Sequence, residues 1–431
     1  MTAGTVLVLG ADGYLGWATC LHLSAGGYQV IAADSLVRRR WDRECGTRSL
    51  IPIRSMPERV RLWQKLTGRR IAWSRLDLGD ASAVADLVAQ AQPEAVVHFA
   101  EQRSAPFSMI DRAHAAMTQA NNVIGTLNLL FALRDHAPDT HLIKLGTMGE
   151  YGTPNIDIEE GFITINHNGR SDRLPFPMQP GSFYHLSKLH DSHNIQFCCR
   201  VWGLRATDLH QGVVYGWRTD EIDAHPGLRT RFDYDAIWGT VLNRFCVQAA
   251  VGLPLTVYGK GGQTRGFLDI RDTVACVRLA LQNPPANGEY RVFNQFTEQF
   301  SVAGLAAKVS DARTAHDLKT SIVHLPNPRV EREDHYYNAR HQRLLDLGLQ
   351  PHYLADTLID SVIAMTQRYG GRVDPVELEQ PNVDWRRGGV PWRTPSTKQE
   401  ALRPVQVLSA GANRRSGAAT PSPKARLAQA R

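Results

Sequence analysis

The sequence lacks the cysteine spacings of disulfide-stapled and zinc-binding domains. Its 431 residues include six cysteines, with no Cys-x-x-Cys pair and no spacing typical of a metal site. We therefore predict buried free thiols in a reducing compartment, and no bound metal. The six are Cys20, Cys45, Cys198, Cys199, Cys246 and Cys276.

Long apolar runs are also missing. No stretch approaches the roughly 18 consecutive apolar residues of a membrane-spanning helix. The first residues lead directly into the apolar run Thr5–Leu9, without a basic start or a cleavage-site pattern. We therefore expect a cytoplasmic protein with no leader and no membrane span.

Excess basic charge is absent from most of the chain. The formal net charge is +7, and residues 391–431 alone hold eight basic residues and one acidic residue, a difference of +7. The rest is formally neutral, so the charge gives no reason to expect nucleic-acid binding. Because 391–431 is rich in Ala, Ser, Pro, Gly and Arg, we predict a disordered basic tail there.

What the sequence does contain is a regular alternation of short apolar runs and amphipathic stretches. This alternation is typical of β-α-β units, and it predicts an α/β fold, a doubly wound parallel (Rossmann) sheet with a smaller mixed α/β substrate-binding domain. The expected strands are Thr5–Leu9, Gln29–Ala33, Ile71–Arg75, Ala95–Phe99, His141–Leu145 and Arg205–Leu209. The expected helices are Gly13 to Ala25, Ala81–Ala91 with Asp80 as N-cap, Met117–Arg134, and Tyr184 to Trp202.

Two insertions interrupt this alternation. We assign 1–205 to the sheet domain with insertions at 36–68 and 153–183, and 206–390 mainly to the smaller domain, with some segments returning to the sheet. The first insertion is basic, and we expect it to be irregular. In the second, Asn168-Gly169 between β-branched residues predicts a hairpin in an ordered lid.

A glycine motif, Gly10-Ala-Asp-Gly13-Tyr-Leu-Gly16, joins the first strand to the first helix. Glycines at these points allow a tight turn and close approach of the backbone to a pyrophosphate at a helix N-terminus. Asp34 ends the second strand, where a carboxylate binds both ribose hydroxyls and repels a 2′-phosphate. We therefore predict an NAD-binding domain, although the run Arg38-Arg39-Arg40 leaves a phosphate-binding alternative open.

Further cofactor contacts are expected around this motif. Asp77 follows the third strand, where it either accepts the adenine amino group or caps a helix. Asn121 is expected beside the cofactor or in a purely structural role. The remaining candidates are Tyr14, Leu15, Ser35, Leu36, Val37, Arg38 and Val214.

A tyrosine and a lysine four residues apart form the candidate catalytic group. Tyr184 and Lys188 share one helix face, so the ammonium and an oxidised nicotinamide can lower the tyrosine pKa enough for it to take a sugar hydroxyl proton. Thr147, at the carboxyl end of a strand, is expected to bind the same hydroxyl. Glu150 is either an acid/base group or a salt-bridged loop residue, and His185 either relays a proton or is structural.

These motifs carry a resemblance to a known family. The chain resembles the extended short-chain dehydrogenases of the nucleotide-sugar epimerase/dehydratase superfamily, and among them the UDP-sulfoquinovose synthases. The likeness covers roughly residues 5–385. Its most specific strings are Glu101-Gln-Arg-Ser-Ala-Pro106, Lys144 to Asn155, Phe183 to Lys188, Asp208 to Gly216, Val257 to Arg265, Pro326 to Glu331 and His335-Tyr-Tyr337.

The resemblance implies an enzyme of sulfolipid biosynthesis that forms a carbon–sulfur bond and is classed with the hydrolases acting on such bonds. Its substrates would be UDP-glucose and sulfite, and NAD would oxidise C4 of the sugar. That ketone acidifies C5 for loss of the C6 hydroxyl, sulfite adds at C6, and the hydride returns to C4. A homodimer and a sulfite-delivering protein are further expectations.

The resemblance also supplies site residues. Met148 and Gly149 stand where 4,6-dehydratases have an adjacent Asp-Glu pair, so Met148 joins the catalytic candidates and a different elimination geometry is implied. Guanidinium groups suit sulfite or a diphosphate because they bind both in bidentate fashion. The implied substrate contacts are Arg103, Thr147, Gln211, Val241, Leu242, Asn243, Arg244, Thr256, Val257, Tyr258, Arg265, Arg329, Val330 and Glu331.

Two alternatives stay open at this point. The first is an NAD-dependent UDP-sugar 4-epimerase or 4,6-dehydratase. The second is a non-catalytic NAD-sensing or scaffold protein, for which Tyr184, Lys188 and Thr147 would not be needed together.

Overall fold

The computed structural model of the chain describes residues 3–314, 320–354, 356–379 and 383–389. The tail expected at 391–431 lies outside these residues. Residues Met1–Pro391 cluster as one compact unit, and their division into two domains near residue 205 stays a prediction. No helix within the described ranges is long and apolar enough to cross a membrane.

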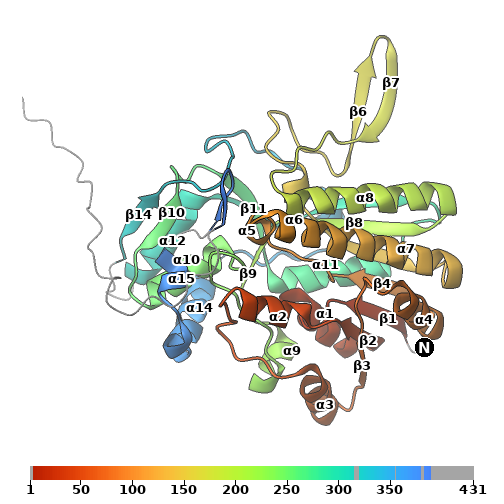
Figure 1. Cartoon of the computed structure of the whole chain (residues 1–431), viewed down its shortest axis with the longest axis horizontal. Helices are drawn as coiled ribbons and strands as arrows, with labels where there is room; N and C mark the ends of the chain where they lie inside the picture. Colours follow the sequence, from red (N-terminus) through yellow and green to blue (C-terminus); the bar gives the residue numbers. More distant parts are fainter. Residues whose placement is uncertain (1–2, 315–319, 355, 380–382, 390–431) are drawn as a thin grey trace, which may run out of the picture. The chain divides into compact units, whose positions relative to one another are not determined.

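Seven parallel strands form the main sheet, in the order β12-β8-β5-β4-β1-β2-β3 (Figure 1). Their bounds are β1 Ala3–Leu9, β2 Tyr28–Asp34, β3 Ile71–Arg75, β4 Ala95–His98, β5 His141–Thr147, β8 Arg205–Gln211 and β12 Tyr290–Gln295. The strand order reverses between β1 and β4, and ligands of such sheets bind where it reverses, at the carboxyl ends. The predicted Rossmann fold is confirmed.

Both faces of this sheet are covered because its strands are apolar on both sides. Along β1, Val6 and Val8 pack into one core with Trp17, while Leu7 and Leu9 pack into another on the opposite face. Successive strand side chains point to opposite faces, so an all-apolar run needs helices on each. Helices of the first core are α1 Tyr14–Ala25 and α11 Ile270–Gln282, and those of the second are α4 Ala81–Ala91, α7 Gly125–His136 and α8 Phe183–Trp202.

The predicted helices form, with one difference. Asp80 caps α4 as expected, since its Oδ1 accepts the N–H of Ala83 at 3.0 Å. The helix expected over Met117–Arg134 is instead α6 Arg112–Gln119, a π-helical turn η1 Ala120–Ile124, and then α7. Such turns often occur at functional sites, and this one contains Asn121.

The first insertion is helical, which corrects the expectation that 36–68 is irregular. It forms α2 Val37–Glu44 and α3 Met56–Thr67. Ser55 and Glu58 make a capping box at the start of α3, with Ser55 N–H donating to Glu58 Oε2 at 2.9 Å. Arg59 of α3 then forms a buried ion pair with Asp12 of the glycine loop. The insertion therefore supports the loop directly.

The second insertion contains the predicted hairpin. Strands β6 Phe162–His167 and β7 Arg170–Pro175 pair antiparallel around Asn168 (φ 48°) and Gly169 (φ 75°). Positive φ at both central residues matches the right-handed strand twist, which is why Asn-Gly is favoured there. The hairpin projects from the compact unit (Figure 1). Its role as a lid stays a prediction.

Most of the remaining elements form a smaller α/β part, which follows β8 along the chain and begins with β9. Its strands pair as β13-β11-β9, β10-β14 and β15-β16, and its core gathers side chains such as Trp217 and Phe245. Its strands are β9 Val213–Tyr215, β10 Leu255–Tyr258, β11 Thr264–Asp269, β13 Glu298–Ser301, β14 Ile322–Leu325, β15 Val383–Asp384 and β16 Gly388–Gly389. Its helices are α10 Val241–Ala250, α12 Val302–Thr314, α14 Asp356–Arg368 and α15 Val376–Glu379. Helices α9 Asp220–Asp223 and α13 Gln342–Asp346 pack on the main-sheet core instead, and α5 Ala105–Ser108 lies after β4. All six cysteines are buried free thiols, as predicted.

Candidate active site

The glycine loop forms a cradle at the end of β1. Gly10 has φ 82°, a conformation that favours glycine, and a Cβ there would collide with the backbone of Phe99. A Cβ on Gly16 would collide with the carbonyl oxygen of Gly10. Gly13 caps the N-terminus of α1. Gly10 and Gly16 thus allow the tight turn and the close packing of helix on strand, and all three glycines line a cavity at the helix N-terminus, so the cradle fits the pyrophosphate of a dinucleotide.

Asp34 lies at the end of β2 with both carboxylate oxygens held by the backbone. Oδ2 accepts the N–H of Asp12 at 2.9 Å, and Oδ1 accepts the N–H of Leu36 at 2.6 Å. Burial, and next the charge of Asp12, raises the pKa of Asp34 to about 6. Near neutral pH this carboxylate is ionised and fixed, as an acceptor for ribose hydroxyls should be.

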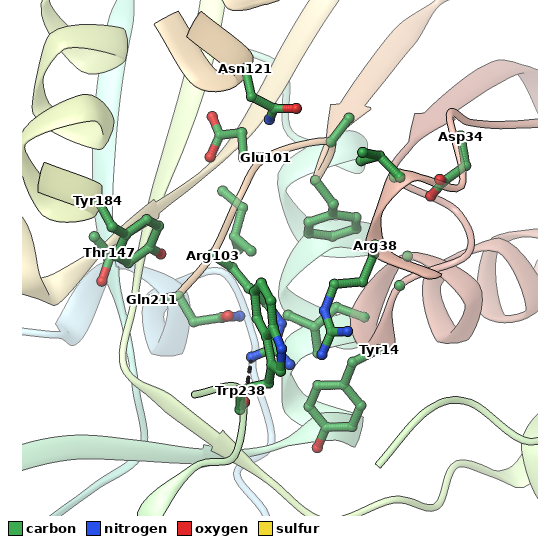
Figure 2. A pocket seen from close by; sticks show the side chains of 18 of the residues that line it. Tyr14, Asp34, Arg38, Glu101, Arg103, Asn121, Thr147, Tyr184, Gln211 and Trp238 are labelled. Carbon is green, nitrogen blue, oxygen red and sulfur yellow. Dashed lines mark hydrogen bonds between the residues drawn. The ribbon is translucent and has the colours of Figure 1, made fainter. Parts of the chain in front are cut away.

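A cavity of about 290 Å³ connects these groups to the end of β5. Figure 2 shows Asp34 on one side of this cavity and Tyr184 with Thr147 on the other, with Arg38, Trp238 and Arg103 between them. The expected cofactor contacts that line it are Gly10, Gly13, Tyr14, Leu15, Gly16, Asp34, Ser35, Val37, Arg38, Asp77, Asn121 and Val214. Thr147, Tyr184, Lys188, Arg103 and Gln211 line it too. Leu36 is outside this lining and contributes its N–H to Asp34.

Tyr184 and Thr147 meet at the carboxyl end of β5. Gly149 N–H donates to Thr147 Oγ1 at 3.2 Å. Burial, and next the charge of Glu150, raises the pKa of Tyr184 to about 12, while Arg103, Lys144 and the Thr147 hydroxyl act to lower it. Without an oxidised cofactor beside it, the phenol therefore keeps its proton at neutral pH.

Lys188 lies one helical turn after Tyr184 on α8. Its ammonium donates to the carbonyl oxygen of Leu145 and forms an ion pair with Glu101. Burial lowers the pKa of Lys188, while Asp191 and Asp208 act to raise it. The ammonium is thus tied to the backbone of β5 and to a buried carboxylate.

Glu150 is fully buried and outside the cavity lining. Its Oε1 accepts the N–H of Thr147 at 3.0 Å, its Oε2 accepts the Ser192 hydroxyl at 2.9 Å, and Lys144 Nζ lies 3.6 Å away. This is a capping box, and its Thr-x-x-Glu spacing is visible in the sequence. Met148 is also outside the lining, in a core with Tyr151 and others. These positions favour the salt-bridged alternative for Glu150.

His185 is not part of this cavity lining and is half-buried. Its Nδ1 lies 3.0 Å from the Ser182 hydroxyl. Burial, and then the charges of Arg329 and Arg265, lowers the pKa of His185 to about 3. The ring is therefore neutral at physiological pH, which suits the structural alternative better than proton donation.

The other expected substrate contacts lie outside the lining as well. Arg244 on α10 donates to the Tyr258 hydroxyl at 2.9 Å and to the Thr256 carbonyl at 3.1 Å. Arg265 pairs with Glu331. The rest of this set is Val241, Leu242, Asn243, Val257, Arg329 and Val330, with Val257 fully buried and Val330 53% exposed. Their binding roles stay predictions.

The site contains residues that sequence reasoning missed. Trp238 stacks on Arg38, with the guanidinium carbon 3.8 Å from the ring centroid, and its carbonyl accepts from Arg103 at 3.1 Å. Asp233 accepts from Arg103 at 2.5 Å. Both belong to an irregular segment after β9 that carries no local motif. Glu101 does carry a signal, because it directly follows an apolar strand at the ligand-binding edge of the sheet.

Comparisons with known proteins agree with this geometry. Residues 6–294 match the family model described as the NAD dependent epimerase/dehydratase family. UDP-sulfoquinovose synthase from Spinacia oleracea, named as chloroplastic, is 60% identical over 385 residues, covering 89% of this chain and 80% of the relative. The UDP-sulfoquinovose synthase of Sulfolobus acidocaldarius is 44% identical over 384 residues, covering 89% and 98%.

Solved structures with the same fold are more distant. A UDP-glucose 4-epimerase from Stenotrophomonas maltophila, solved with NAD and formylated UDP-arabinopyranose, has a TM-score of 0.66 at 20% identity over 86% of this chain and 99% of its own. The Bifidobacterium longum UDP-glucose 4-epimerase with NAD+ and UDP has a TM-score of 0.62 at 19% identity, over 84% and 98%. These likenesses establish the fold alone. The family matches go further: the chain belongs to the NAD-dependent epimerase/dehydratase family and, within it, to the UDP-sulfoquinovose synthases.

Proposed function

We propose that this chain converts UDP-glucose and sulfite to UDP-sulfoquinovose and water, with NAD as a resident cofactor. The observation that carries the proposal is the meeting of Tyr184, Thr147 and Lys188 at one end of a cavity whose other end holds the glycine loop and Asp34. The relatives with 60% and 44% identity give the substrate class. The same convergence argues against a non-catalytic scaffold.

The chain's residues divide between holding the cofactor and moving a proton. The glycine loop and α1 N-terminus would hold the pyrophosphate, Asp34 the adenosine ribose, and Lys188 the nicotinamide ribose. When bound, NAD supplies a hydride acceptor for C4 of the sugar and later returns the hydride. Arg103 and Gln211 line the sugar side of the cavity and would orient the substrate.

Tyr184 would take the proton of the C4 hydroxyl. Thr147 and this phenol line the same end of the cavity (Figure 2), so the two oxygens can bracket one sugar hydroxyl. The tyrosine pKa of about 12 must fall before it can act as a base. Lys188 and a cationic nicotinamide ring would both stabilise the phenolate. Thr147 then orients the reacting hydroxyl while Tyr184 holds its proton until the ketone is reduced again.

The remaining steps occur on the sugar. A C4 ketone acidifies the C5 hydrogen, and loss of that proton with the C6 hydroxyl releases water and leaves a conjugated enone. Sulfite adds through sulfur at C6, a proton returns to C5, and reduction at C4 completes the product. Overall, the C6–OH bond is replaced by a C6–S bond, with one water released for each sulfite consumed.

The direct test incubates purified protein with UDP-glucose, NAD and sulfite and analyses the products by mass spectrometry. We expect a UDP-hexose sulfonate that depends on sulfite, and loss of this product in Tyr184→Phe with NAD binding retained. UDP-galactose alone, or a UDP-4-keto-6-deoxy sugar, would instead support the epimerase or dehydratase alternative. Full activity of Tyr184→Phe would remove the assigned base.

A homodimer is also part of the proposal. Phe131 on α7 and Phe197 and Val201 on α8 are 44%, 49% and 54% exposed. An apolar group of this kind on two neighbouring helices suits burial against a second copy. Light scattering should give twice the chain mass, and Phe197→Asp should shift it toward the monomer. Delivery of sulfite by another protein and a cytoplasmic location stay predictions.

A further inference from the structure

Glu101 occupies a distinctive place among the carboxylates of the cavity. Three carboxylate residues line it, namely Asp34, Asp77 and Glu101. Asp34 ends β2 and Asp77 follows β3, whereas Glu101 follows β4, which lies on the other side of β1 and next to β5. Within the described part of the chain, Glu101 is thus the one lining carboxylate on the side where Thr147 and Tyr184 lie.

The carboxylate of Glu101 is buried against the ammonium of Lys188. The two side chains are 2% and 3% exposed and form an ion pair. Neither oxygen of Glu101 accepts a hydrogen bond from any other described residue, unlike Asp34 with its two backbone donors. A buried carboxylate without such donors is unfavourable unless a cation compensates it, so Lys188 is what stabilises it there.

His98 is the other ring near this carboxylate, with Nε2 3.7 Å from Glu101 Oε1. Burial, followed by the charges of Lys188 and Lys144, lowers the pKa of His98 to about 3. The imidazole is therefore neutral and cannot replace the ammonium as a counter-charge.

We propose that Glu101 is a positioning residue for Lys188, holding its ammonium beside Tyr184 and keeping it protonated through turnover. The inference rests on the proposed function, in which Lys188 serves Tyr184. An ammonium has three N–H donors. The carbonyl oxygen of Leu145 accepts one of them, and the ion pair with Glu101 holds the ammonium from a second side, so these two contacts limit the directions of the remaining N–H groups.

The charge of Glu101 acts on two proton equilibria. Burial already lowers the pKa of Lys188, and removing a neighbouring anion lowers it further. While Lys188 is protonated, the same removal leaves more uncompensated positive charge near Tyr184 and lowers the tyrosine pKa as well. The other charged or titratable groups that act on this pair are Asp191 of α8, Asp208 of β8, Lys144 of β5, Glu150 and Arg103.

The test compares the pH dependence of kcat in the wild-type holoenzyme with Glu101→Gln, which keeps the shape and removes the charge. The acidic limb of the profile reports the ionisation of Tyr184, and the alkaline limb reports the loss of the proton of Lys188. We expect both limbs to move to lower pH, the alkaline limb by about 1–3 units. Glu101→Asp, which keeps the charge, should retain the wild-type limbs even if its kcat is lower. The matched control is Glu94→Gln, an exposed glutamate just before β4, which should leave the profile unchanged.

Different outcomes would overturn different statements. A fall in kcat that is uniform with pH in Glu101→Gln, or limbs that move equally in Glu94→Gln, would mean that Glu101 has only a structural role. If Glu101→Gln does not fold, the pH profile of Glu101→Asp decides. Limbs that move by more than half a pH unit in Glu101→Asp would contradict the proposal, and limbs that stay in place would support it. Absence of a sulfonated product in the wild type would refute the proposed function itself, which is a separate result.

Discussion

The carboxylate of Glu150 accepts the backbone N–H of Thr147 at 3.0 Å, from a position with no exposed surface. The contact fixes the turn in which β5 ends, and therefore the place of Thr147 in the cavity that Tyr184 also lines. Lys144 and Ser192 occupy the rest of the carboxylate. Glu150 thus supports the backbone of the active-site threonine from a position outside the cavity lining.

We expect Glu150 substitutions to act mainly through stability. Glu150→Ala leaves the buried ammonium of Lys144 with one partner fewer and the Thr147 N–H without an acceptor, which should lower the free energy of unfolding by about 3–5 kcal/mol. Glu150→Gln keeps an acceptor for the Thr147 N–H and should lower the free energy of unfolding by less. Urea unfolding measures the free energy of unfolding of both variants. If Glu150→Gln is as stable as the wild type but inactive, Glu150 is an acid/base group after all.

The pH dependence of NAD binding should report on Asp34. Its pKa of about 6 means that the carboxylate is ionised above this pH and protonated below it. NAD affinity should therefore fall as the pH drops through 6, because a protonated carboxyl gives up an acceptor for the ribose. Asp34→Asn should bind NAD about 10- to 100-fold more weakly, with this pH dependence lost. Calorimetric titration of nucleotide-free protein measures both effects, and Asp77→Asn should retain the pH dependence.

The sheet and the cofactor cradle could be predicted from sequence because their signals are local. Apolar runs located all six expected strands, and Asn168-Gly169 located the hairpin turn. The strand ends were less accurate, since β5 and β8 continue through polar Thr147 and Gln211, whose backbones still pair with each other. Hydrogen bonding of the backbone does not require an apolar side chain.

Contacts between segments distant in sequence could not be predicted. The basic insertion holds one local helix signal, the capping box of Ser55 and Glu58, but its arginines are explained only by partners elsewhere in the chain. Arg39 and Arg59 both bind Asp12, and Arg38 stacks on Trp238, which is 200 residues later. Asp233 could not be predicted for the same reason. It lies in an irregular segment, and its role is visible only in the structure, where the guanidinium groups of Arg38, Arg103 and Arg231 pair with it.

Arg59 offers a test of this support. It is fully buried, pairs with Asp12, and lies over Trp17 with its guanidinium carbon 4.6 Å from the ring centroid. Arg59→Ala should lower the free energy of unfolding by about 3–5 kcal/mol, and Arg59→Lys should recover only part, since it lacks the planar group. Arg61→Ala, exposed on the same helix, should stay within about 0.5 kcal/mol of wild type. Equal effects of Arg59→Ala and Arg61→Ala in chemical denaturation would contradict this role.

The titration of Tyr184 should depend on the oxidation state of the cofactor. Burial, and next the charge of Glu150, raises its pKa to about 12 in the chain alone, so the phenolate needs stabilisation before Tyr184 can take a proton near neutral pH. Lys188 is present with or without cofactor, so we expect the additional stabilisation to come from the positive nicotinamide ring. The measurement is the phenolate absorbance of the wild type minus that of Tyr184→Phe, followed as a function of pH. The midpoint of this difference should lie several pH units lower with NAD+ than with NADH or without nucleotide. If that difference titrates equally with NAD+ and NADH, the nicotinamide charge does not activate the tyrosine, and the chain's own groups must supply the whole shift.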